Sequence, residues 1–236
     1  MLTWSLRNPQ FPERVVPTGS GVTALDFSTR TPNLLAVGLR DGTLAIYNAK
    51  SEGADLVAPV LDSSALPAKH MEPVWEVRWV DKGRDRGEAL VSSSSDGRVC
   101  EWSTKKGLAA TNLMVLRRSG GNAEGAISRE TAGLAFAFSP LDHNTYYAGT
   151  ADGALHKCSC SYNEQYLETY HPGHSGPVYK VRHSPFGPAL LSCSADWTVK
   201  LWDPAQPRNP VGSFHASDLT DAVHDVAWSP TSSTVT

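Results

Sequence analysis

The chain has 236 residues, a formal net charge of −3 and 40% hydrophobic residues. Its 21 basic and 24 acidic side chains are balanced and form no basic stripe, so a nucleic-acid partner is not expected. No apolar run approaches the length of a membrane span, and the opening MLTWSLRNPQ has neither the basic region nor the apolar core of a signal peptide, so no membrane partner is expected. We predict an intracellular, cytoplasmic protein whose cysteines are reduced and buried: Cys100, Cys158, Cys160 and Cys193.

Residues 1–16 resemble the end of a repeating unit. The dipeptides Trp-Ser at 4–5 and Asn-Pro at 8–9 parallel Trp-Asp at 202–203 and Asn-Pro at 209–210. We therefore expect this segment to form the last two strands of a unit whose beginning is missing.

The first whole unit spans residues 22–61. It runs through VTALDF, LLAVG, a turn at Asp41-Gly42 and TLAIYN, with the alternation of half-buried strands. The Asp-Gly pair suits a tight hairpin because glycine tolerates a positive φ.

The second whole unit spans residues 70–116. Its predicted strands lie in PVWEVRW, ALVSSSSDGRVCEW and LAATNLMVL. The hydrophilic stretch DKGRDRGE at 81–88 suits the exposed tip of a hairpin between the first two strands.

The third whole unit spans residues 132–171 and has its turn at Asp152-Gly153. Within it His156, Cys158 and Cys160 alternate along one strand, which raises the alternative of a soft-metal site. Three ligands on one strand are poorly placed around a tetrahedral ion, and no CxxC pair completes them. We therefore expect no metal and no other cofactor.

The fourth whole unit spans residues 174–215. It follows Gly173, contains the run SCSADWTVKLWD, and ends with NPVGSFH as its outer strand. The next segment, 222–236, contains AVHDVAWSP, which reads as the first strand of a further unit.

Two sets of four polar side chains recur at matching spacings. The first set is separated by 22, 4 and 6 positions and the second by 18, 4 and 6, so only the first interval changes, as a loop insertion would change it. Such residues are costly to bury without partners, and we expect each set to form one buried hydrogen-bonded chain. The two predicted tetrads are His70, Ser92, Asp96 and Trp102, and His174, Ser192, Asp196 and Trp202.

The other two whole units cannot form complete tetrads, because Tyr47 and Cys158 stand where the tryptophan would be. All four units nevertheless share strands, turn and spacing. This pattern predicts an all-β fold, a partial WD-repeat β-propeller with four full blades and a part-blade at each end, forming a single domain over 1–236. The alternative is a five-bladed ring, closed by contact between residues 2–6 and 223–228.

Several phrases are more specific than the general WD pattern: WSLRNPQFPERV, GTADGALHKCSCSYNEQYLETY and AVHDVAWSPTSSTV. Together with LLAVGLRDGTLAIYN, PVWEVRW and SCSADWTVKLWD, in this order, they resemble the propeller of axonemal dynein intermediate chains, in particular the outer-arm intermediate chain 1 group. The resemblance covers nearly all of the chain.

The resemblance implies a non-catalytic scaffold subunit of an outer dynein arm, located in the cytoskeleton of the axoneme in a cilium or flagellum. Its propeller would bind the dynein heavy chain tail beside a second intermediate chain, and it would meet the microtubule only indirectly, through the arm. Light-chain binding is doubtful, because the segment that carries light chains precedes the propeller and is absent here. The alternative is a WD-repeat adaptor of another intracellular complex. No cluster of catalytic groups is evident, so an enzyme is not expected.

A rigid ring of blades can hold a few aromatic or arginine side chains for a partner to bury. Five residues at or beside the predicted turns and strand starts are candidate partner contacts. They are Trp197, Arg98, Arg40, Trp75 and Tyr179.

Overall fold

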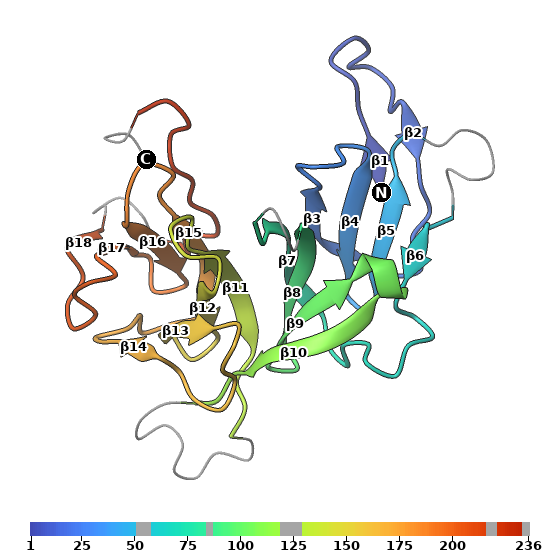
Figure 1. Cartoon of the computed structure of the whole chain (residues 1–236). Helices are drawn as coiled ribbons and strands as arrows, with labels where there is room; N and C mark the ends of the chain where they lie inside the picture. Colours follow the sequence, from blue (N-terminus) through green and yellow to red (C-terminus); the bar gives the residue numbers. More distant parts are fainter. Residues whose placement is uncertain (51–57, 84–86, 119–128, 216–220, 233–236) are drawn as a thin grey trace.

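The computed structural model describes residues 1–50, 58–83, 87–118, 129–215 and 221–232. Its strands form four antiparallel sheets of four strands and one sheet of two strands (Figure 1). The predicted fold class is confirmed: the chain is all-β, a partial WD-repeat β-propeller. None of the helical turns in the described part of the chain has the length and apolarity needed to cross a membrane.

Each four-stranded sheet is one blade, and its strands are neighbours in the order of the sequence. The first blade contains β3 (Val22–Phe27), β4 (Leu34–Leu39), β5 (Leu44–Asn48) and β6 (Leu61–Asp62). The second contains β7 (Val74–Asp81), β8 (Glu88–Ser94), β9 (Arg98–Ser103) and β10 (Ala109–Val115), with a 3-10 turn at Thr104–Lys106. The third contains β11 (Gly133–Phe138), β12 (Thr145–Thr150), β13 (Leu155–Ser159) and β14 (Glu168–Tyr170). The fourth contains β15 (Val178–His183), β16 (Leu190–Ser194), β17 (Val199–Trp202) and β18 (Gly212–Phe214).

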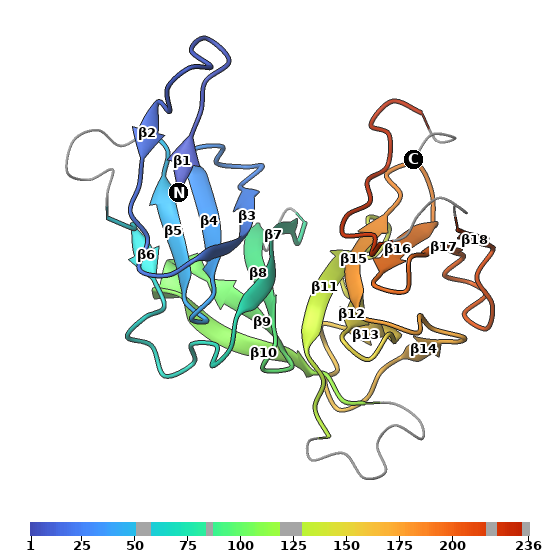
Figure 2. The same ribbon diagram turned by 180° about the vertical axis from the view of Figure 1, so that it is seen from behind.

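The inner strands of the four blades, β3, β7, β11 and β15, lie next to one another in that order (Figures 1 and 2). Blades pack face to face through apolar side chains, so each interface is a separate core. Close approach at these interfaces requires glycine. A β-carbon on Gly149 would lie 2.7 Å from Cγ1 of Val178 in the next blade, and one on Gly38 would lie 2.9 Å from Cγ1 of Val74.

At the N-terminus, β1 (Leu2–Thr3) and β2 (Arg14–Val15) form a two-stranded sheet. The adjoining residues Met1 and Val16 pack with Leu35, Val37 and Tyr47 of the first blade. The side chains of Leu25 and Phe27 on β3 remain about half exposed.

Residues 221–232 follow the fourth blade without joining a ladder. The Val223 N–H donates to the Ser194 carbonyl at 3.2 Å, and Trp228 Nε1 donates to the Arg182 carbonyl at 3.1 Å. The segment therefore lies against the inner half of the fourth blade, and the rest of the predicted part-blade, 233–236, lies outside the described residues.

The five-bladed ring is wrong. The β1–β2 sheet lies beside the first blade, whereas the C-terminal segment lies beside the fourth, and the two are at opposite sides of the molecule in both views (Figures 1 and 2). The described residues form an open arc of blades.

Candidate functional site

In the second blade, four polar side chains form one buried chain of hydrogen bonds. His70 Nδ1 lies 2.9 Å from Asp96 Oδ2, and because a carboxylate only accepts, this nitrogen carries the proton. His70 Nε2 lies 2.8 Å from the Ser92 hydroxyl, which also accepts a hydrogen bond from Trp102 Nε1 at 2.7 Å. One hydroxyl thus pairs with both buried rings.

The fourth blade repeats this arrangement. His174 Nδ1 lies 3.0 Å from Asp196 Oδ2, its Nε2 lies 2.7 Å from the Ser192 hydroxyl, and Trp202 Nε1 donates to the same hydroxyl at 2.8 Å. His174 precedes β15, the inner strand of the fourth blade. The tetrad therefore joins the segment that enters this blade to β16 and β17.

The tetrad aspartates stay ionised. Burial alone would raise the pKa of Asp196, but hydrogen bonds from Thr198, Ser175 and His174 outweigh it and hold the pKa at about 2. Burial opposes ionisation of Asp96 in the same way, yet contacts with His70 and Arg98 hold its pKa well below the usual range.

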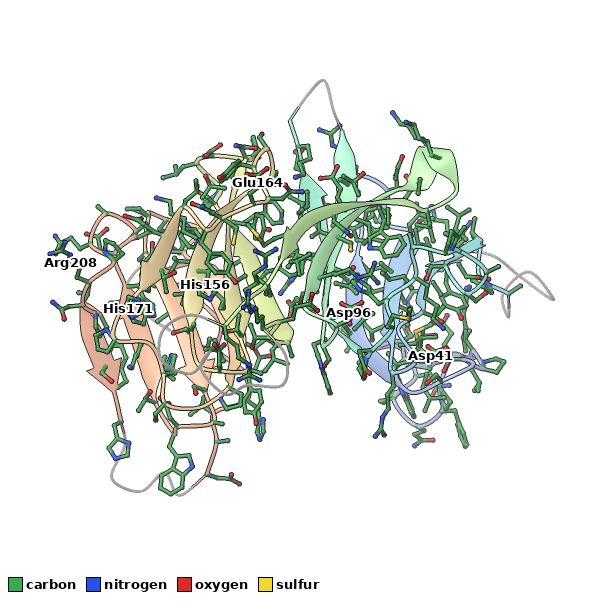
Figure 3. The ribbon with its side chains drawn as sticks, turned by 90° about the horizontal axis from the view of Figure 1, so that it is seen from below. Asp41, Asp96, His156, Glu164, His171 and Arg208 are labelled. Carbon is green, nitrogen blue, oxygen red and sulfur yellow. The ribbon has the colours of Figure 1, made fainter. Side chains whose placement is uncertain are left out.

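The first and third blades hold their turn aspartates differently. Asp41 accepts from the backbone and hydroxyl of Thr43, at 3.1 and 2.9 Å. Asp152 accepts from the hydroxyls of Thr150 and Thr131. Figure 3 shows Asp41 and Asp96 in the adjoining first and second blades, well apart from His156 in the third.

Removing the shared hydroxyl should destabilise the fourth blade. Ser192→Ala leaves His174 Nε2 and Trp202 Nε1 buried without their partner, and we expect the free energy of unfolding to fall by about 2–4 kcal/mol. Chemical denaturation measures this loss. Ser175→Ala is the matched control, because Ser175 is exposed and contacts Asp196 through its backbone N–H. Equal stability of the two variants would contradict the role of the tetrad.

His156, Cys158 and Cys160 do not form a metal site. His156 stacks on Tyr166 with ring centroids 3.7 Å apart, and its Nδ1 lies 3.0 Å from the Thr169 hydroxyl. Burial raises the pKa of the Cys158 thiol to about 12, which disfavours the thiolate that a metal needs. Across the described residues, no group of three or more His, Cys, Asp or Glu side chains is placed to hold a metal ion.

His156 should make stability depend on pH. Burial lowers the pKa of His156 to about 4 from an ordinary value near 6.5. Between these pH values His156 is protonated in the unfolded chain but stays neutral in the folded chain. The free energy of unfolding is therefore expected to fall as pH falls from about 6.5 to 4. His156→Gln should flatten this slope, measured by urea titration at several pH values, whereas substitution of the exposed His143 by Gln should leave it unchanged.

Four of the five predicted partner contacts define one face of the arc. Strand pairing places the first residue of each inner strand opposite the end of the second strand, as in Val22 with Leu39 and Val178 with Ser194. The starts of the inner strands and the turns after the second strands therefore share one face. We call it the turn face and define it by Arg40, Trp75, Tyr179 and Trp197.

A cavity on the turn face is lined by residues from all four inner strands. Thr23, Trp75, Leu134 and Tyr179, the second residues of the four inner strands, line a cavity of about 230 Å³ together with Lys180 and His224. Tyr179 stacks on His224 at 5.0 Å, and Trp75 is 39% exposed while its Nε1 donates to the Ser95 hydroxyl at 2.6 Å. This cavity thus presents two flat rings, Trp75 and Tyr179, that neighbouring side chains hold in place.

Trp197 is the most unusual residue of this face. It has a φ of 68°, in the left-handed region, where the turns of the other blades have Gly42, Gly97 and Gly153. A side chain with a β-carbon is strained there by roughly 1–2 kcal/mol. The indole is nevertheless 44% exposed, so packing does not explain its presence.

The two arginines differ from each other. Arg40 is exposed, whereas the Arg98 guanidinium donates to Asp96 at 2.8 Å and to the Lys69 carbonyl at 2.7 Å. Arg98 therefore supports the tetrad of its own blade, and we do not include it in the turn face.

A charge cluster between the second and fourth blades was not predicted from the sequence. Glu76 on β7 is 4% exposed and accepts from Arg78 Nε at 3.0 Å and from Arg182 Nη1 on β15 at 3.1 Å. It also pairs with Lys180 on β15. The second and fourth blades are thus linked across the third.

Loss of the Glu76 charge should weaken the connection between the second and fourth blades. Glu76→Gln leaves three cations facing one another, and we expect the free energy of unfolding to fall by about 2 kcal/mol, less than a fully buried pair would lose because the cations are partly exposed. Thermal and urea unfolding measure the change. Glu72→Gln, at an exposed position nearby, is the control and should have no effect.

Residues 164–203 match the family model "WD domain, G-beta repeat". The chain is 50% identical over 97% of its length to "Dynein axonemal intermediate chain 4" of Mus musculus, and 39% identical over its whole length to "Dynein intermediate chain 2, ciliary" of Heliocidaris crassispina. It is also 39% identical to "Dynein axonemal intermediate chain 1" of Bos taurus over 86% of its length. The chain spans 30%, 33% and 29% of these three relatives, respectively.

Two solved structures share the fold. The computationally designed Ika8 protein aligns with 90% of this chain and 54% of its own, with a TM-score of 0.58 and 23% identity. The designed Ika4 protein aligns with 79% of this chain and 93% of its own, with a TM-score of 0.53 and 26% identity. The resemblance to dynein intermediate chains is confirmed, although identity is higher to the chain 4 sequence than to the chain 1 sequence, so assignment to the chain 1 group is approximate.

Proposed function

Because this chain is homologous to axonemal dynein intermediate chains, we propose that it is a scaffold subunit of an outer dynein arm in the axoneme of a cilium or flagellum. In this proposal its propeller binds the tail of a dynein heavy chain beside a second intermediate chain, and the arm carries it to the microtubule. The observation that carries the proposal is the 50% identity to an axonemal intermediate chain over 97% of the chain.

A non-catalytic role agrees with how the acidic side chains are used. The turn aspartates Asp41, Asp96, Asp152 and Asp196 all accept hydrogen bonds from neighbouring side chains or backbone groups of their own blades. Hairpin and tetrad geometry therefore accounts for them without a reaction. In this proposal ATP hydrolysis belongs to the heavy chain.

The turn face is the surface we assign to the heavy chain. Trp75, Tyr179 and Trp197 supply large, flat, partly exposed rings, and Arg40 adds an exposed cation. Aromatic and arginine side chains of this kind dominate binding energy when a partner removes them from water. Rings already held by Ser95 and His224 lose little freedom on binding.

Substitution of Trp197 tests this assignment. Trp197→Gly relieves the strain of the left-handed backbone, so the blade stays folded, but it removes the indole ring. We expect binding of the tagged chain to the heavy chain tail, measured with axonemal extract, to weaken at least tenfold. The control is Phe186→Ala, which removes a ring exposed in the β15–β16 connection on the opposite face. Loss of binding in Phe186→Ala alone would mean that the heavy chain binds the opposite face and would contradict the assignment to the turn face. Absence of the chain from axonemal extracts, or its recovery with another complex lacking a heavy chain, would defeat the proposed function.

A further inference from the structure

Lys82 and Cys160 meet on the face opposite the turn face. Lys82 follows β7 in the second blade, and Cys160 follows β13 in the third. The Lys82 Nζ lies 3.2 Å from the Cys160 Sγ, although the two residues are far apart in the sequence. Amine and thiol are thus in contact across a blade boundary.

The Lys82 amine is held by its surroundings. Its side chain is 6% exposed, lies 3.1 Å from Glu101 Oε2, and places Nζ 4.7 Å from the centre of the Phe138 ring. The backbone N–H groups of Lys82 and Cys160 donate to the Gly87 and Asn144 carbonyls, each at 2.8 Å. Side chains and main chain together fix the contact.

Cys160 differs from the other three cysteines. Cys100, Cys158 and Cys193 are fully buried, whereas Cys160 is partly exposed and can meet a small oxidant. Burial raises the pKa of the Cys160 thiol, and the Lys82 ammonium opposes that rise. Cys100 instead points its Sγ at the Asn112 amide oxygen, 3.1 Å away, and has no amine in this position.

We propose that Lys82 and Cys160 are a modification site, at which hydrogen peroxide joins the two side chains through a covalent sulfur–nitrogen bond. The thiol first reduces the peroxide, sulfur losing two electrons as the O–O bond breaks, to give a sulfenic acid and one water. Glu101 takes a proton from the Lys82 ammonium, and the free amine attacks sulfur. The S–O bond breaks, and its oxygen leaves as a second water after taking a proton from the attacking nitrogen. Glu101 then releases to solvent the proton that it took from the ammonium.

The balance is one thiol, one neutral amine and one hydrogen peroxide giving one sulfenamide and two waters. Sulfenic acids are known to condense with nitrogen in this way, and here the nitrogen is already in contact. The product ties the second blade to the third. This inference is independent of the proposed binding to the heavy chain, because none of its residues lies on the turn face.

Peptide mapping of the whole chain tests the cross-link. After treatment with hydrogen peroxide and digestion without reductant, we expect one joined peptide containing Lys82 and Cys160, lighter by two hydrogen atoms than the sum of its parts. Dithiothreitol should separate it. Sulfenic or sulfinic acid on Cys160 without a joined peptide, or a joined peptide with an additional oxygen, would overturn the proposal.

Two variants identify the reacting groups. Lys82→Arg keeps the positive charge beside Glu101 but removes the amine, so Cys160 should stop at the sulfenic acid and be trapped by dimedone. Cys160→Ser should yield no joined peptide. Peroxide should also raise the Tm of the parent protein and leave that of both variants unchanged, because a cross-link restricts the unfolded chain. A joined peptide in Lys82→Arg, made through another lysine, would contradict the assigned pair.

Discussion

In the second and fourth blades, one shared serine hydroxyl joins the entry of the blade to its second and third strands. Ser92 pairs with both His70 and Trp102, and Ser192 does the same for His174 and Trp202, so two buried rings are satisfied by one small side chain. The histidine lies before the inner strand, the serine on the second strand and the tryptophan on the third. A single hydrogen-bonded chain therefore fixes how the peptide enters each blade and where its turn stands. In the fourth blade this chain includes Asp196, which directly precedes Trp197 of the turn face.

Blades without a tetrad show which part of the fold is more general. The first and third blades keep four strands although Tyr47 and Cys158 replace the tryptophan, and threonine hydroxyls hold Asp41 and Asp152. Apolar packing between neighbouring blades is thus sufficient for the sheet, while the tetrad adds hydrogen bonds between the entry segment and the second and third strands. The second and fourth blades, which carry complete tetrads, are also the two that Glu76 connects. Ion pairs thus join the two blades that carry complete tetrads directly, past the third blade between them.

The sequence predicted the features that depend on short intervals. Asp-Gly turns and serine, aspartate and tryptophan spacings repeat within a blade, so the blade pattern and the members of each tetrad could be read from the chain. Contacts between different blades could not be predicted from the sequence. Glu76 meets Arg182, and Lys82 meets Cys160, only after the blades are placed side by side. The position of Arg98 after a turn predicts an exposed side chain, but its guanidinium donates a hydrogen bond to the nearby Asp96 carboxylate. The segment 222–228 alternates like a strand yet has no ladder, since a strand also needs the main chain of a neighbour.

Trp197 illustrates how local strain and a binding surface are connected. Its left-handed backbone opposes folding by roughly 1–2 kcal/mol, and the exposed part of its ring gains nothing from the core. Removing an indole of this size from water contributes about 2 kcal/mol or more, so burial of the ring in the proposed complex would more than offset the strain. Because the rest of the turn is fixed by Asp196 and Thr198, the ring already projects in one direction before binding. The free chain therefore carries the strain of Trp197, and under the proposed function the heavy chain would supply the compensating burial.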